Sequence, residues 1–591
     1  MSQFNGFKSA FQNHMTRQLD SMTRLLVLVS VMISIAGCAM APAPIEQAEF
    51  NRDVAADRRA AEAISAPIAG PLSIEEAVAR ALKFNLERRA RMLEEAVALG
   101  QFESGRYDML PRLVAQAGYR TRSEDLVTRS KDSVTGQPSL ANPFISSDRT
   151  THYTDLGLTW SLLDFGTSYF NSKQNADRVM VAAERRRRAM HQLMQDVRSA
   201  FWRTVAAQRL EGQVRDAVRL AEEALEDAKR VENERVRAPI DSLRFQRQLL
   251  ENLRLLETAQ QELATARVDL LNLINAPLGT ALKVIEPAEG LGRKVLEVPT
   301  DRLERIAVER NAELLEQFYN SRIAVEETRK VLTRLFPNLS FSYNVKYDSN
   351  SYLVHRDWNE AGLSLSYNLL NLMSGPAQMK LAEAGVALAN QRRMATQMVT
   401  LAQVHLARIR YDNSLVQVGR AQAIAAIDDR IARITADREA AQASSKLEAV
   451  ANRTSSILAL SRLFQAMSDA YVAASRLQAT LGLEPDFESM QDIPLDRLTA
   501  LVRESDRSWR EGRLPGDPGS GFRAAREPEP GELRATWSLN SRESMLGQGM
   551  DDKDAPQPKA PAGHPGAADA AAIELRPSEV IAVARSSSTP E

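Results

Sequence analysis

The chain has 591 residues, a formal net charge of -1 and only 6% aromatic residues. Balanced charge argues against nucleic-acid binding by the chain as a whole. A single cysteine excludes an intrachain disulfide and a thiolate metal cluster.

The N-terminus has the features of a targeting segment. Basic residues, Arg24 the last of them, precede the apolar run Leu25 to Ile35, which is too short to span a bilayer. This pattern predicts a signal peptide over residues 1–37. The sequence Ile35-Ala36-Gly37-Cys38 resembles a bacterial lipobox, which makes Cys38 the lipidation site; Ala39 after it favours outer-membrane sorting. An ordinary signal peptide that happens to contain a cysteine is the alternative.

Residues 38–70 are small, polar and contain proline, and they predict a lipidated N-terminal tether. A first repeat follows over residues 71–298, and Pro71 with the acids after it indicates a helix start. After Pro111 the apolar period changes from 3.6 to 2, which predicts strands over about 112–124 and 152–164. Long proline-free helices are then expected from Gly166 to Pro239 and from Asp241 to Asn275. The first of these makes a rod of about 100 Å.

The second half repeats the first. Asn85 and Pro111 recur as Asn311 and Pro337 at a shift of 226 residues. Downstream the shift is 207, as from Val197 to Val404. The difference places a longer loop in the first half. We therefore expect a duplicated unit, with a second repeat over residues 299–505 that has strands over about 338–348 and 357–371 and a short closing helix.

The tail from 506 to 591 is rich in proline, glycine and alanine and is expected to be disordered.

Each predicted strand has one apolar and one polar face, which is typical of the wall of a membrane barrel. The apolar face, expected to contact lipid, contains Leu158, Trp160, Phe341, Tyr343, Leu365 and Tyr367. The polar face, expected to line a lumen, contains Gln116, Thr159, Ser161, Ser340, Ser364 and Asn368.

Four strands are too few to close a membrane barrel, and an open sheet edge in lipid leaves backbone groups unsatisfied. Copies of the chain must therefore pool their strands. Two copies supply eight strands and a filled barrel, whereas three supply twelve and leave a lumen. A soluble sandwich, whose apolar face meets a core, is the alternative. Since no other apolar run is long enough for a membrane helix, any crossing must use strands.

Two halves, each with a short helix, a proline-flagged hairpin and a long helix pair, resemble the TolC family of outer-membrane factors. Together with the lipobox, the chain is most similar to the lipoprotein branch that serves tripartite efflux systems. The resemblance covers about residues 71–505 and includes the sequence Leu481-Gly482-Leu483-Glu484-Pro485. It implies a mostly α fold in which a homotrimer forms a twelve-strand β-barrel, set in outer-membrane lipid, on an α-helical barrel in the periplasm.

The resemblance also implies partners and sites. A periplasmic adaptor (membrane fusion) protein would contact the helix tips at Pro239, Asp241, Ser444 and Glu448, and an inner-membrane transporter would complete the system. A periplasmic aperture would lie near Asp428, Asp429 and Asp437, although ordinary helix-surface carboxylates are the alternative for each. The implied function is a passive exit duct in the outer membrane for efflux, or for type I protein or polysaccharide secretion.

Other functions receive less support from the residues. A structural envelope lipoprotein that serves as a scaffold is the competing interpretation. No catalytic constellation, phosphate loop or metal-ligand spacing of histidines is present in the sequence, so neither an enzyme nor a cofactor is expected. The arginine run Arg185 to Arg188 suggests nucleic acid by charge alone, but on a long helix of an exported protein a solvated face is expected.

Overall fold

The computed structural model describes residues 44–129, 131–138, 143–234, 239–287, 290–443, 445–485 and 493–523. These residues all belong to a compact unit that spans 1–533. A second unit, 534–591, lies wholly outside the described residues, as does the predicted signal peptide with Cys38.

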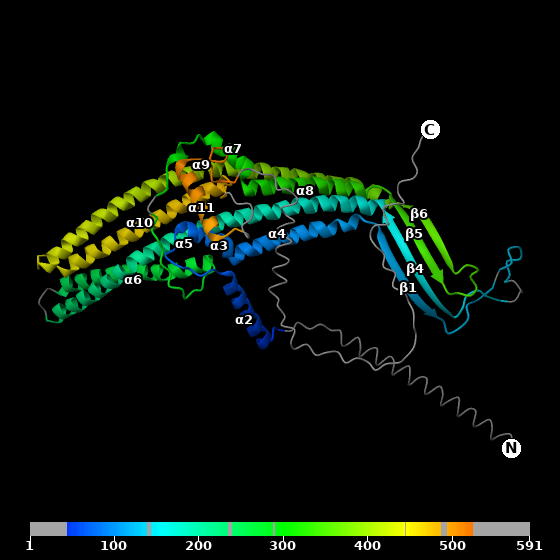
Figure 1. Ribbon diagram of the computed structural model, residues 1–591, viewed down its shortest axis with the longest axis horizontal. Coiled ribbons are helices and arrows are strands. Elements are labelled where there is room, and N and C mark those ends of the chain that lie inside the picture. The colour runs from blue at the N-terminus through cyan, green and yellow to red at the C-terminus, as the bar shows by residue number, and fades with distance from the viewer. Residues whose placement is uncertain are drawn as a thin grey trace, which may run out of the picture. The chain divides into compact units, whose positions relative to one another are not determined.

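An antiparallel sheet lies at one end of the first unit, and two pairs of long helices lie at its other end (Figure 1). The sheet has the order β1-β4-β5-β6, so β1 and β6 are its edges. Its strands are β1 (Arg112–Thr121), β4 (Thr150–Ser161), β5 (Asn338–Asp348) and β6 (Asp357–Ser366). The longer first-half loop that we predicted joins β1 to β4 and carries a small hairpin, β2 (Val127–Thr128) and β3 (Phe144–Ile145).

The helices follow one plan twice. The first half contains α3 (Ile74–Phe84), α4 (Leu86–Gly105), α5 (Leu162–Asn233) and α6 (Pro239–Leu273). The second contains α7 (Thr300–Arg310), α8 (Ala312–Arg334), α9 (Leu370–Ala440) and α10 (Lys446–Thr480), and α11 (Leu495–Glu511) closes the fold. With 72 residues, α5 is the longest helix in the described part of the chain. None of the helices described is both long and apolar enough to cross a membrane.

Equivalent hydrogen bonds confirm the duplication. Asn85 accepts a bond from the backbone N–H of Arg88 at the start of α4 and donates one to the carbonyl of Leu273, at 3.0 Å. In the same way Asn311 caps α8 and donates to the carbonyl of Thr480, at 2.9 Å. Each asparagine therefore ties a short-helix corner to the end of the last long helix of its own half.

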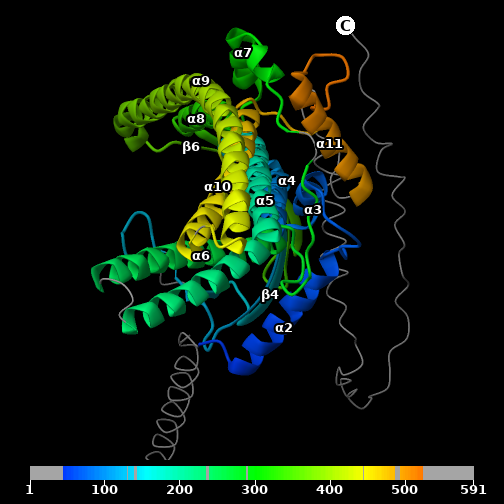
Figure 2. The ribbon, with the colours of Figure 1, turned by 90° about the vertical axis from the view of Figure 1, so that its left-hand side faces the viewer.

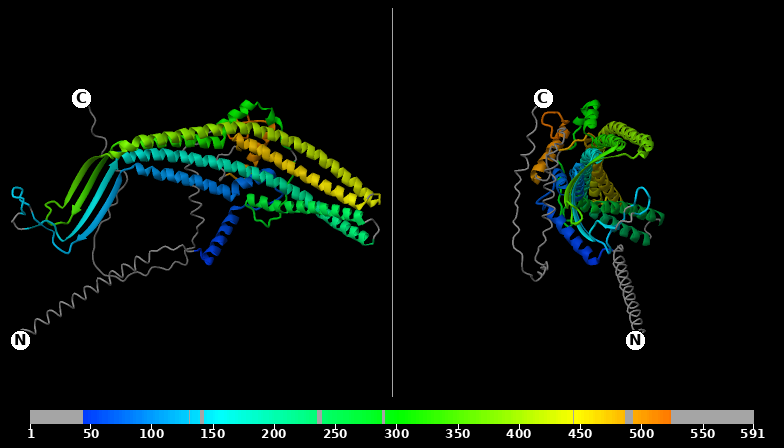
Figure 3. Two further views of the ribbon diagram at one scale, coloured as in Figure 1. Left: turned by 180° about the vertical axis from the view of Figure 1, so that it is seen from behind. Right: turned by 90° about the vertical axis from the view of Figure 1, so that its right-hand side faces the viewer.

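The long helices form a layer with two free edges. Near the tips the packing order is α9, α10, α5, α6, as the two neighbouring pairs in Figure 2 show. Nearer the sheet the order is α4, α5, α8, α9. Figure 3 shows from behind how α5 and α9 continue through both levels. Hence α9 is an edge throughout, and α4 and α6 form the opposite edge.

The core lies midway along the long helices, where the short helices pack on them. One cluster joins α3, α5, α10 and α11 around the buried Phe201 and Trp202. A second joins α7, α9 and the end of α11 around Tyr411 and Trp509.

The predicted boundary at residue 506 was wrong. Residue 506 lies inside α11, and Leu514 and Phe522 beyond it are buried in the second core cluster, so residues 506–523 are not a disordered tail. The predicted tether contains a helix, α2 (Gln47–Ile64), without buried residues. The chain after α2 is held by Arg80, whose guanidinium donates to the carbonyls of Ala66 and Pro67 at 2.8 and 3.0 Å.

β4 and β6 end earlier than expected, because helices begin there, and β1 also ends early, at Thr121 instead of about residue 124. Ser161 is the last residue of β4, and its hydroxyl accepts from the N–H of Asp164 in the first turn of α5. Tyr367 and Asn368 lie beyond β6, and the Asn368 side chain accepts from the N–H of Leu370, the first residue of α9. The two positions therefore belong to the strand–helix junction.

Candidate functional site

The strand register brings five of the six apolar residues expected to contact lipid onto one face of the sheet. Leu158 lies opposite Tyr343, and Trp160 opposite Phe341. On the next pair, Leu365 lies opposite Leu339. These side chains are exposed or half-buried, with Leu365 70% exposed. A sandwich would cover this face, so the exposure argues against the soluble alternative.

The other face contains the polar residues expected to line the lumen. Thr159 lies opposite Ser342, and Ser161 opposite Ser340, which in turn lies opposite Ser364. Gln116 lies on the same face, opposite Asp155. Ser161 also has a structural role, because it donates to the Asn338 side chain at 2.8 Å while it caps α5.

Three charged residues on this polar face were not among the site residues that the sequence selected. Lys346 lies opposite Asp155, and its ammonium is 2.6 Å from a carboxylate oxygen of Glu360. Alternation in the sequence places each charge on the polar face. That the three charges lie close together, however, depends on the register of β4, β5 and β6, which could not be predicted from the sequence.

At the tips the structure describes only part of the expected site. Asp241 and Glu448 lie in the first turns of α6 and α10, and both are exposed. Ser444 lies outside the described residues, and for Pro239 only its position as the first residue of α6 is described. The two pairs are linked near the tips by an ion pair of 2.6 Å between Asp227 and Lys446.

The three aspartates of the expected aperture all lie on α9. Asp429 forms an ion pair of 3.0 Å with Arg433 one turn further on, which is an ordinary helix-surface arrangement. Asp428 is half-buried and Asp437 is exposed. One copy does not bring these carboxylates together, because nine residues of helix, roughly 13 Å, separate the first from the last.

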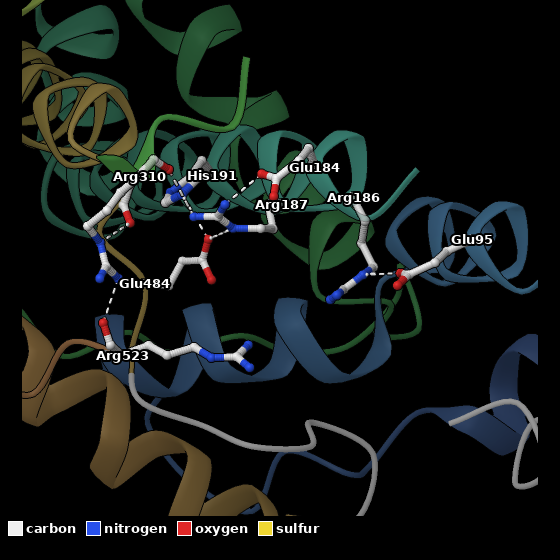
Figure 4. Close-up of polar contacts among 9 residues, drawn as sticks. Glu95, Glu184, Arg186, Arg187, His191, Arg310, Glu484 and Arg523 are labelled. Atoms are coloured by element: carbon white, nitrogen blue, oxygen red, sulfur yellow. Dashed lines mark hydrogen bonds and ion pairs between the residues drawn. The ribbon is translucent and has the colours of Figure 1, made fainter. Parts of the chain in front are cut away.

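The arginine run is a packing hub, so the expectation of a solvated face was wrong for its central members. Arg185 pairs with Glu316 of α8 at 2.8 Å, and Arg186 with Glu95 of α4 at 2.5 Å. Arg187, only 18% exposed, binds Glu484, which lies just after α10 (Figure 4).

A buried charged junction surrounds Arg187 (Figure 4). Its guanidinium also contacts Glu184 at 2.6 Å and donates to the carbonyl of Arg310 at 3.1 Å. His191 lies 3.6 Å from Glu484. We call these five residues the charged junction: Glu184, Arg187, His191, Arg310 and Glu484.

Electrostatics at the charged junction follow from burial. Burial raises the pKa of Glu184 to about 7, although Arg187 opposes this effect. The charge of Arg187 and its hydrogen bond, together with His191, hold the pKa of Glu484 well below its ordinary value despite burial. Burial lowers the pKa of Arg310. One arginine is thus shared between two carboxylates that differ in their tendency to bind a proton.

Within the described residues, no group of three or more His, Cys, Asp or Glu side chains has the arrangement to hold a metal ion. The charged junction contains arginine as its central group, which is a partner for carboxylates and not a metal ligand. Its chemistry is that of a structural contact between the two halves.

Comparison with known protein families and with curated proteins gives no match to the sequence. Comparison with solved structures does. The CmeC outer membrane channel of Campylobacter jejuni aligns over 73% of this chain and 89% of its own, with a TM-score of 0.55 and 13% identity. A membrane protein from Pseudomonas aeruginosa aligns over 69% and 93%, with a TM-score of 0.53 and 16% identity.

The outer membrane protein VceC from Vibrio cholerae aligns over 69% of this chain and 96% of its own, with a TM-score of 0.51 and 12% identity. At such identities the likeness concerns the fold. It agrees with the resemblance drawn from the paired halves and with the duplicated asparagine corners. The chain therefore has the TolC-like fold of outer-membrane channels.

Proposed function

We propose that three copies of the chain form an exit duct through the outer membrane, with a twelve-strand barrel in the lipid and an α-helical barrel in the periplasm. The observation that carries this proposal is a sheet with two unpaired edges, β1 and β6, and an exposed apolar face. In lipid each unpaired backbone group costs several kcal/mol, so the edges must pair with other copies.

The two edges of the chain are different surfaces, which favours a ring. One edge consists of β1, α4 and α6 from the first half, and the other consists of β6 and α9 from the second. Contact between unlike surfaces is head-to-tail, and it closes into a ring when the rotation per copy allows. Three copies supply twelve strands, enough to leave a lumen.

Apolar side chains on both helical edges support this contact. On α9, large apolar residues that are at least 43% exposed form one stripe: Leu388, Val399, Leu406, Ile424, Ile427 and Ile431. The opposite edge exposes Leu93 and Val97 on α4 and Leu243 and Leu250 on α6. Such stripes on long helices are faces for packing against another helix.

The two sheet faces then have distinct roles. The face with Leu158 and Phe341 contacts lipid, and the face with Ser364 and the charges Asp155, Lys346 and Glu360 lines the lumen. Trp160 and Phe165 pack edge to face where β4 meets α5, and we place them at the membrane interface. Cys38 serves as the lipid anchor.

The duct is passive. Asp241 and Glu448 at the tips dock a periplasmic adaptor, and an energised inner-membrane transporter selects the cargo. Asp428, Asp429 and Asp437 lie on α9 before the tip and contribute to the periplasmic aperture. The cargo is small molecules in an efflux system, or a polypeptide or polysaccharide in a secretion system.

Deletion of the gene, combined with purification of the protein, tests the proposal. We expect the detergent-extracted protein to have the mass of three copies, and the deletion strain to retain a compound or product that the parent exports. A scaffold lipoprotein predicts a monomer and unchanged export. That result for every cargo tested would reject the duct.

A further inference from the structure

The two halves of the chain place equivalent backbone at two junctions. Asn85 and Asn311 make the same pair of bonds, 226 residues apart. After the last long helix of each half, Asn275 and Gly482 both have a positive φ, of 51° and 63°, at a shift of 207. The residue after each donates back to the helix at 2.9 Å. The same shifts therefore map one junction onto the other.

Within one chain, the charged junction joins the first half to the second. Glu184, Arg187 and His191 on α5 face the residues Arg310 and Glu484, which end α7 and follow α10 (Figure 4). Four of the five are buried, with exposed fractions from 3% for Glu484 to 8% for Glu184. The Arg187 side chain is 18% exposed.

The equivalent positions carry no charge. A shift of 207 residues takes Glu184, Arg187 and His191 to Gln391, Met394 and Met398 on α9, and takes Glu484 back to Pro277. A shift of 226 takes Arg310 back to Phe84. We call these five residues the uncharged set. A fold that needed these charges at every junction would carry them in both halves.

The two sides of the uncharged set lie at opposite edges of the chain. Met394 and Met398 are 48% and 65% exposed on the α9 edge. Pro277 follows α6 at the other edge and is exposed, whereas Phe84, the last residue of α3, is only 8% exposed. In a ring of copies, the contact that is equivalent to the charged junction is the contact of α9 with the first half of the next copy.

We infer that Met394 and Met398 of one copy pack against the exposed Pro277 of the next copy, beside its buried Phe84, and that the charged junction prevents the two kinds of contact from exchanging. The inference rests on the proposed ring and continues around it the interface seen within the chain. Its physical basis is mismatch. If α5 docked on the end of another copy's first half, Arg187 would keep Glu184 of its own helix but would face Pro277 and Phe84 in place of Glu484 and the carbonyl of Arg310. A buried charge without its partner is strongly destabilising.

The partner of this surface is therefore a second copy, recognised by the absence of charge. Methionine suits this role, because its flexible thioether side chain fills irregular apolar gaps. Around the ring, the charged junction within each copy would alternate with the uncharged contact between copies. The end of each half would then accept only one of the two long helices, α5 or α9. This is specificity by repulsion as well as by attraction.

Crosslinking between differently tagged chains tests the inference. One tagged chain carries Met398→Cys and the other carries Pro277→Cys, and the full-length proteins are co-expressed and treated with a short bismaleimide. Gln397→Cys replaces Met398→Cys in the control, because Gln397 lies on the side of α9 opposite the apolar stripe of Leu388 and Leu406. We expect a product that carries both tags with Met398→Cys, at several times the yield of the control.

The outcomes separate this inference from the proposed function. Trimers that form normally but give no two-tag product, or as much of it in the control, overturn the inference and leave the duct intact. Chains that do not assemble at all contradict both.

Discussion

A single guanidinium, that of Arg187, joins the two halves of the chain. It binds Glu184 on its own helix, Glu484 after α10 and the carbonyl that ends α7. The desolvation of a buried charge is offset only while such partners remain in place. Arg188, next in sequence, is 53% exposed and lies 3.8 Å from Glu316, so this ion pair contributes little to stability.

Replacement of these neighbours therefore gives opposite results. Arg187→Met should destabilise the protein by roughly 3–5 kcal/mol, because Glu484 remains buried without its cation. Arg188→Met should change stability by less than about 1 kcal/mol. Thermal unfolding of the purified proteins, followed by circular dichroism, measures both. Equal losses would show that Arg187 is no more than a surface charge.

The raised pKa of Glu184 predicts a dependence on pH. Its carboxyl binds a proton more tightly in the folded than in the unfolded chain, since burial moves the pKa from 4.5 to about 7. The stabilisation is complete below about pH 4.5 and is lost as the pH rises through 7. The amount lost is of the order of 1–3 kcal/mol.

We therefore expect the melting temperature of the wild type to fall more steeply between about pH 5 and 8 than that of Glu184→Gln. Glu94→Gln on α4, where the carboxylate is 56% exposed, provides the control and should keep the wild-type slope. Parallel curves for all three proteins would mean that Glu184 is ionised in the folded state.

The sequence predicted little of this junction. Arg185 to Arg188 lie on a helix with charges around it, and only the fold brings in Glu484, which is 297 residues away. The faces of the alternating strand residues were accessible because the pleat is a local pattern. Cys38 lies outside the described residues, so its lipidation stays a prediction. The asparagine corners were accessible because the chain repeats them.

At the scale of elements, the alternating pattern of the strands predicted their faces but not their ends. Period-2 alternation assigned the faces of β4 and β5 as the register has them. It did not find the ends of β4 and β6, where Ser161 caps α5 and the Asn368 side chain accepts from the N–H of Leu370 at the start of α9. At such a position, one side-chain hydrogen bond decides whether the helix begins or the strand continues for another residue. The alternation of apolar residues does not reveal this hydrogen bond.

Adjacent residues of β4 provide the sharpest test of the faces. Leu158→Arg should lower the stability of the assembled barrel by about 2–4 kcal/mol, because it places a charge in lipid near the midplane. Thr159→Arg, one residue later and on the polar face, should assemble as the wild type does. The fraction of heat-stable trimer in membrane extracts measures the difference. Equal yields would mean that β4 does not face lipid on its Leu158 side.

At the scale of the whole molecule, the composition of the chain was a poor guide to where order ends. Residues 506–523 contain proline and glycine, as does the rest of the tail, yet Trp509 and Phe522 are buried against the second half. The bridge between Phe522 and Pro485 brings this segment beside Glu484. Packing against distant elements, which composition does not reveal, determines the boundary.

The account as a whole depends on copies that pool their strands around a lumen. One copy offers two unpaired strand edges and two unlike helical edges, and a ring satisfies both. Ser364 lies on the polar face of β6, and Leu365 beside it lies on the apolar face. Because each copy contributes one β6, the number of Ser364 side chains in a lumen equals the number of copies.

Single-channel recording of Ser364→Cys, with a charged thiol reagent added to the aqueous phase, tests this directly. We expect the current through one channel to fall in three discrete steps as three thiols react, and Leu365→Cys to give no such steps because its thiol faces lipid. A protein that forms no channel, a Ser364→Cys channel that the reagent leaves unchanged, or a different number of steps would contradict a lumen pooled from three copies.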